Sequence, residues 1–124
     1  MNNMNELQKQ FDALVEAIDA YNSGNKMGRA AAILRFQFVV DAALEALTEA
    51  LLNKEVVCKN RRDLISQGHT HGLIKNEKTW LRIIFDREHL DEAWDDCIAE
   101  VIYENITELY LDVLSDFIAK IEIG

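Results

Sequence analysis

The residues best suited to chemistry in this 124-residue chain lie between residues 86 and 96, which read DREHLDEAWDD. The stretch holds Arg87, His89 and Trp94 among six acidic residues. An arginine can hold a phosphate through two parallel hydrogen bonds, a histidine can transfer protons near neutral pH, and a tryptophan can stack on a ring. These residue types suit a phosphate- or nucleotide-binding site, but they also suit a polar turn between two helices.

An arginine and a histidine with six residues between them occur twice, as Arg62 with His69 and as Arg82 with His89. HEPN-type ribonucleases use an arginine and a histidine at a similar spacing beside a helix turn. Six arginines and three histidines produce such spacings readily by chance, so the pattern alone assigns no nuclease site.

The sequence patterns for other kinds of site are weaker. His69 and His71 are two positions apart and would not share a helix face, and the chain has no HExxH or CxxC motif. The segment from Gly24 to Gly28 lacks the lysine and hydroxyl positions of a phosphate-binding loop and follows no strand. Glu100, Glu104 and Glu108 share a face, as on an ordinary solvated helix. We therefore predict no bound metal and no cofactor.

The composition indicates a folded helical protein, with 49% hydrophobic residues, five glycines and no proline. Cys58 and Cys97 are far apart, which favours a reducing compartment, and we expect both to be at least half buried. The chain begins without a signal-peptide pattern, and no apolar run approaches the roughly 18 residues of a membrane span. We expect one domain over residues 1–124, located in the cytoplasm.

The net charge of −9 is unevenly distributed along the chain. Residues 1–53 contain four basic and seven acidic residues, for a net charge of −3. Residues 54–87 contain eight basic and four acidic residues, for a net charge of +4. Residues 88–124 contain one basic and eleven acidic residues, for a net charge of −10. The acidic total disfavours DNA binding and membrane contact, whereas the basic middle could bind a phosphate or an acidic partner.

Apolar residues at three- and four-residue steps predict the helices that must position these residues. A first helix is expected from Asn5 to Tyr21, and a second from Met27 to Asn53 that is apolar on more than one side. An irregular connection from Asn53 to Asp63 should lead to a short third helix. Asn76 is the predicted cap of a fourth helix that contains Trp80 and Phe85. Asp95 is the predicted cap of a last helix that reaches the C-terminus. Together they predict an all-α bundle of long and short helices, and the generous apolar surface predicts a homodimer.

Several of these blocks resemble the nucleotidyltransferase substrate-binding protein family, a HEPN-related group of small helical bundles. The matching blocks are RAAAILRFQFVVDAALEAL from Arg29, RRDLI from Arg61, HGLIKNEKTWLRIIFDRE from His71 and WDDCIAEVIYENITELYL from Trp94. The resemblance implies an all-α four-helix up-and-down bundle with an extra short helix, which forms a homodimer. It also implies that this dimer pairs with a small, separate nucleotidyltransferase subunit, in which catalysis is expected. It also implies that the helical protein binds a nucleotide or phosphorylated acceptor, and that some relatives are ribonuclease toxins of toxin–antitoxin pairs.

The chain departs from the family where relatives place the arginine–histidine pair. Arg87 stands at the family arginine, Glu92 stands where the histidine is expected, and His89 lies three positions earlier. A glutamate there would repel a scissile phosphate, so we favour a non-catalytic binding subunit over a ribonuclease. The alternatives are a ribonuclease using Arg87 with Glu92 or His89, and a helical interaction module. The residues predicted to bind the ligand are Arg87, Trp94, Arg61, Arg62 and Arg82.

Overall fold

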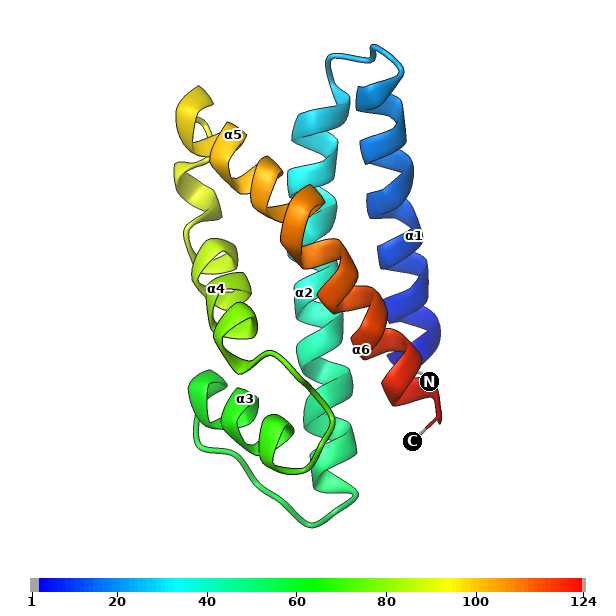
Figure 1. Cartoon of the computed structure of the whole chain (residues 1–124), viewed down its shortest axis with the longest axis vertical. Coiled ribbons are helices and arrows are strands. Elements are labelled where there is room, and N and C mark those ends of the chain that lie inside the picture. Colours follow the sequence, from blue (N-terminus) through cyan, green and yellow to red (C-terminus); the bar gives the residue numbers. More distant parts are fainter. Residues whose placement is uncertain (1–2, 124) are drawn as a thin grey trace.

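The computed structural model describes residues 3–123, which form helices joined by turns and contain no strand within that range. The first two helices, α1 (Asn3–Asn22) and α2 (Gly28–Leu52), form an antiparallel pair (Figure 1). Gly28 lets them meet closely, because a Cβ at this position would lie 2.6 Å from the backbone nitrogen of Tyr21. Leu7 and Leu14 of α1 pack fully buried against this side of the bundle.

The chain then turns into α3 (Arg61–Thr70) and α4 (Glu77–Glu88). Asn60 caps α3, since its side chain accepts a hydrogen bond from the Asp63 N–H at 2.8 Å, while the Asp63 carboxylate accepts from the Lys59 N–H at 2.9 Å. The helix thus begins within the segment predicted to be irregular. Asn76 precedes α4 as predicted, but its side chain makes no capping hydrogen bond.

A short 3₁₀ turn, η1 (Leu90–Glu92), leads to the last helical stretch. Asp95 caps α5 (Asp96–Asn105) as predicted, accepting hydrogen bonds from the N–H groups of Cys97 and Ile98. A π-helical turn, η2 (Ile106–Tyr110), joins α5 directly to α6 (Leu111–Ile123). The predicted last helix is therefore continuous but contains one wide turn.

Helices α1, α2, α4 and the α5–α6 unit run alternately up and down, with α3 as the extra short helix (Figure 1). This confirms the all-α four-helix architecture. The α5–α6 unit crosses in front of α2 (Figure 1), and aromatic rings pack between the helices. Phe36 stacks on Tyr110 with centroids 5.6 Å apart, and Trp80 meets the edge of Phe117 at 5.2 Å.

Three residues on and after α4 are more exposed than is usual for their residue types. Phe85 is 60% exposed and Trp94 is 85% exposed, so neither contributes to the core in the way that Trp80 does. Cys97 is exposed, although Cys58 is half buried as expected. In α4 the core-facing positions are Trp80, Ile83 and Ile84, and the helical period turns residue 85 away from them. No helix among the described residues is both long and apolar enough to cross a membrane.

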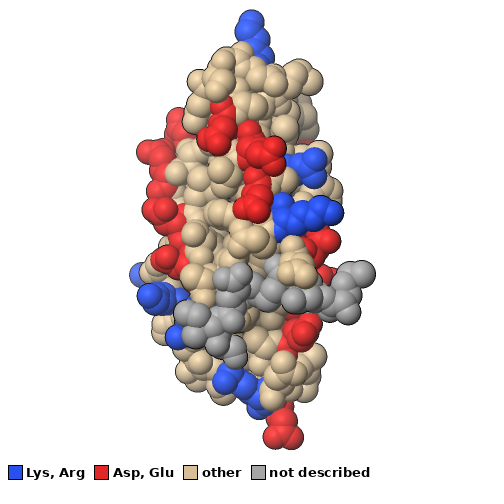
Figure 2. Space-filling view, turned by 90° about the vertical axis from the view of Figure 1, so that its right-hand side faces the viewer, with Lys and Arg blue, Asp and Glu red and all other residues tan. Residues whose placement is uncertain are grey.

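The surface is predominantly acidic on the α1 side of the molecule. Figure 2 shows this side, where acidic side chains form rows in the upper half and along one edge while basic side chains are more scattered. The acidic rows would disfavour contact with a nucleic-acid backbone in that part of the surface.

Candidate functional site

An open groove of about 970 Å³ lies between the second half of α2, the connection after it and the beginning of α3. The chain leaves α2 through a turn in which Glu55 has a φ of 63° and the Val56 N–H bonds back to the Leu51 carbonyl. This turn carries the connection away from α2 before α3 begins, which opens the groove. Its lining residues are Asp41, Leu44, Glu45, Thr48, Glu49, Leu52, Val56, Val57, Cys58, Lys59, Asn60, Arg61 and Leu64.

The two walls of the groove carry opposite charges above an apolar base. Leu44 and Leu64 are buried beneath it and provide an apolar base. Glu45 is an acidic group on the α2 wall, whereas Lys59 and Arg61 are basic groups on the opposite wall. Such a groove suits a ligand with an apolar body and charged groups at its ends.

Arg87 forms an ion pair at the edge of this groove. Its Nε donates to Oδ1 of Asp41 at 2.9 Å and its Nη2 donates to Oδ2 at 3.0 Å. This two-point hydrogen bond raises the pKa of the Arg87 guanidinium despite its partial burial. The predicted binding residue is thus close to the groove through Asp41, but both partners use their charged groups on each other.

The other predicted arginines lie in different settings. Arg61 lines the groove itself and has a longer contact of 3.5 Å with Glu88 of α4, which leaves its side chain 46% exposed. Arg62 is exposed on the same first turn of α3. Arg82 is exposed on α4, near enough to Tyr110 for its charge to counteract part of the rise in the Tyr110 pKa. Of these arginines, the groove contains Arg61.

A second polar cluster joins α4 to the π turn. Asp86 accepts a hydrogen bond from the Tyr110 hydroxyl at 2.6 Å and another from Nδ2 of Asn105 at 3.1 Å. Burial raises the pKa of the Tyr110 hydroxyl well above its usual value, and the bond to Asp86 raises it further. The wide turn η2 ends at Tyr110 and places its ring against Phe36, so this cluster ties three helices together.

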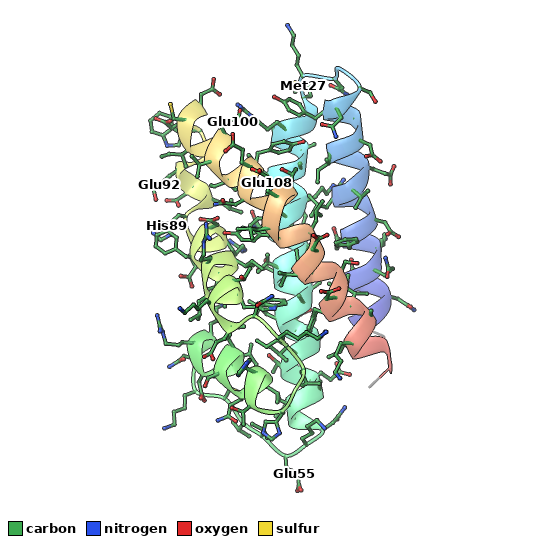
Figure 3. The ribbon with its side chains drawn as sticks, viewed as in Figure 1. Met27, Glu55, His89, Glu92, Glu100 and Glu108 are labelled. Carbon is green, nitrogen blue, oxygen red and sulfur yellow. The ribbon has the colours of Figure 1, made fainter. Side chains whose placement is uncertain are left out.

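Trp94, His89 and Glu92 lie on the outer turn around η1, apart from the groove. His89 stacks on Phe85 with centroids 4.2 Å apart, and its Nδ1 lies 2.7 Å from the Phe85 carbonyl oxygen. That hydrogen bond is the main reason why the pKa of His89 is raised. Figure 3 shows His89 and Glu92 on the outer edge of the molecule. No hydrogen bond or ion pair among the described residues joins Arg87 to His89 or Glu92.

A metal-binding cluster is not formed by the described side chains, among which no three His, Cys, Asp or Glu residues are grouped suitably. Nδ1 of His69 instead lies 3.8 Å from the Glu77 carboxylate.

The sequence did not indicate Asp41, Glu45 or Lys59 as site residues. Asp41 and Glu45 are four residues apart on α2, and this spacing could have indicated one polar face of the helix. It does not indicate which residues form the other wall of the groove.

The fold and groove define a small all-helical bundle of the kind that binds ligands between helices. Residues 2–123 match the family described as "Nucleotidyltransferase substrate binding protein like", and the chain belongs to this family. A solved structure, HI0074 from Haemophilus influenzae, is similar with a TM-score of 0.82 and 19% identity, covering 96% of this chain and 98% of that one. Its structure is described as revealing the fold of a substrate-binding domain of a nucleotidyltransferase. At this identity the likeness shows the fold. None of the curated proteins compared matches the chain.

Proposed function

We propose that this chain is the non-catalytic, substrate-binding subunit of a two-component nucleotidyltransferase. The observation that carries the proposal is the charge-divided groove between α2 and α3, present in a member of this family. Lys59 and Arg61 would hold an anionic group of a nucleotide or phosphorylated acceptor, and the apolar base would contact its body. Nucleotide transfer itself would take place in a separate, small nucleotidyltransferase subunit in the cytoplasm, where free thiols such as those of Cys58 and Cys97 persist.

The ribonuclease alternative receives less support. Its arginine, Arg87, is engaged by Asp41 through two hydrogen bonds. Its histidine candidate, His89, is turned onto Phe85 at the outer edge of the turn. An acid and a base that act on one scissile phosphate have to lie within reach of the same atoms. The absence of RNA cleavage by the purified chain would agree with the binding role.

The groove can be tested by NMR titration of the ¹⁵N-labelled chain with ATP and, separately, with inorganic phosphate. We expect shifts in the backbone signals of residues 56–61, and a dissociation constant about 10-fold weaker in Arg61→Ala, which corresponds to about 1.4 kcal/mol. Arg35→Ala is the matched control, because Arg35 is exposed on α2 away from the groove. Shifts at Arg87 and Trp94 would add those predicted residues to the site. Unchanged spectra throughout would contradict the proposal.

We also propose that two copies of the chain pair through the exposed apolar side of α2. Leu34 and Phe38 are exposed on this helix and Met27 is exposed just before it. A hollow of about 270 Å³ beside Leu34 is lined mainly by apolar residues of α2, the turn around η1 and α5. In a symmetric pair, Phe38 of one copy could fill the hollow of the other. Leu34→Arg should then convert a dimer to a monomer in sedimentation analysis; a wild-type monomer at high concentration would contradict the pairing.

A further inference from the structure

A second exposed apolar row follows the last helical stretch, on a different part of the surface from α2. Its members are Trp94, Ile98, Val101 and Leu109, which are separated by four, three and eight positions. Ile98, Val101 and Leu109 therefore share one side of the helical stretch, and Trp94 lies in the turn just before it. The π turn holds more residues per turn than an α-helix, which keeps Leu109 in line with Val101. Trp94 is 85% exposed and Val101 is 57% exposed. We call these four residues the α5 row.

The α5 row borders the contact between α5 and α4. Asn105 lies between Val101 and Leu109 on the same side of the helix, and its side chain donates to Asp86 of α4. That bond fixes the row beside α4 rather than against the core. Single exposed apolar residues are common on protein surfaces, but four aligned ones beginning with a tryptophan indicate a binding surface. Tryptophan is also among the residues that contribute most to protein interfaces.

Acidic residues flank this row. Glu100, Glu104 and Glu108 follow the same helix at four-residue steps, and Figure 3 shows Glu100 and Glu108 along it. Residues 88–124 contain eleven acidic residues and one basic residue, for a net charge of −10. Glu100 is paired with Arg29 at 3.1 Å, whereas Glu104 and Glu108 are exposed. An occupant of the row therefore has to present positive charge beside an apolar centre.

The charge pattern also separates the possible occupants. A symmetric contact between two copies would bring two acidic rows to one interface, which like-charge repulsion opposes. A nucleic acid or an anionic membrane surface would be repelled for the same reason. A protein with an apolar patch surrounded by lysine and arginine fits both features of the row.

We propose that the α5 row is the docking surface for the nucleotidyltransferase subunit, which would present an apolar patch with a lysine- and arginine-rich margin. This inference rests on the proposed function, because it names the surface by which the two subunits meet. None of the four row residues lines the groove, so the chain would hold the acceptor at one surface and the enzyme at another. The lysine- and arginine-rich margin of the partner's apolar patch would face Glu104 and Glu108.

The test co-expresses the full chain with its cognate nucleotidyltransferase subunit and measures their dissociation constant by calorimetry. Val101→Arg should weaken binding at least 50-fold, because it places a positive charge opposite the basic margin and removes an apolar contact. Trp94→Ala should weaken it about 30-fold, as for a central interface tryptophan. Ala119→Arg is the control, since it adds the same positive charge at an exposed position of α6 outside the row, and we expect an effect of less than about 2-fold. Raising the salt concentration should weaken the wild-type complex.

The outcomes separate this inference from the proposed function. Tight binding that Val101→Arg and Trp94→Ala leave unchanged overturns the docking surface while the two-subunit function stands. No binding by the wild-type chain overturns both. If Val101→Arg instead lowers the sedimentation coefficient of the chain alone, the row pairs two copies and the inference is wrong. Circular dichroism of both variants shows whether they remain folded, and Trp94→Ala, which changes a side chain outside regular helix, provides the test if Val101→Arg unfolds.

Discussion

Asp86 and Arg87 are neighbours in α4, yet their side chains contact different elements of the bundle. Arg87 reaches α2 and pairs with Asp41 at the edge of the groove, whereas Asp86 reaches Asn105 and Tyr110 beside the α5 row. The first contact joins two partly exposed charged groups, and the second includes a fully buried tyrosine. What reads as one short motif is therefore two separate attachments of α4, one to each side of the bundle.

Removing Asp86 should have the larger effect on stability. Asp86→Ala leaves the buried Tyr110 hydroxyl without its acceptor, and we expect a loss of about 2–3 kcal/mol in the free energy of unfolding. Urea denaturation of this variant measures the loss. Asp112→Ala, at an exposed acid of α6, is the control and should change stability by less than about 0.5 kcal/mol. Equal values for the two variants would show that the α4–η2 attachment contributes nothing.

Removing Arg87 should lower the free energy of unfolding by a smaller amount, because water can replace part of its pairing with Asp41. We expect Arg87→Ala to destabilise the chain by about 1–2 kcal/mol, and Arg87→Lys to recover little of this since lysine cannot form the two parallel hydrogen bonds. A double-mutant cycle with Asp41→Ala isolates the pair. A coupling energy near zero would mean that Arg87 is available to bind ligand.

Alkaline pH should act on the Tyr110 side of α4. The folded pKa of Tyr110 is raised, so its contribution to stability is complete below the unfolded value near 10.0 and is lost as the pH rises above that value. The free energy of unfolding should then fall by up to about 1.4 kcal/mol per pH unit for this one proton. Denaturation between pH 9 and pH 11 measures the slope, which should be smaller in Tyr110→Phe. A slope shared equally by both proteins would assign the effect to other tyrosines.

The smallest stability effect is expected at Arg61, whose contact with Glu88 is long and exposed. Arg61→Ala should change the free energy of unfolding by less than about 0.5 kcal/mol, even though it weakens phosphate binding in the groove. Thermal denaturation and the phosphate titration on the same sample distinguish these two roles. A large loss of stability would make Arg61 a structural residue.

The helical architecture could be predicted because apolar periodicity determines where helices form and which side of each is buried. The same period, applied within the run from Trp80 to Phe85, places residue 85 away from the core, so its exposure was within reach of the sequence. The Asp95 cap was also predictable, because the residues it bonds are adjacent in the chain.

The remaining features depend on contacts between distant segments. Arg87 and Asp41 are 46 positions apart, and charge alone does not indicate which of many acids an arginine meets. The groove depends on the turn at Glu55, whose positive φ is unusual for a glutamate and is not suggested by its residue type. The π turn could not be predicted either, since its residues also fit an ordinary helix.

That π turn has a consequence for comparing this chain with its relatives. The wide turn over residues 106–110 takes up one residue more than an α-helical turn, so deleting a single residue there would restore an ordinary turn and leave the angle between α5 and α6 nearly unchanged. Leu114 and Phe117 would then stay in the core. A one-residue gap in this window of an alignment would thus mark a relative with a regular helix here, in which the residue that faces Asp86 has changed although the flanking residues are the same.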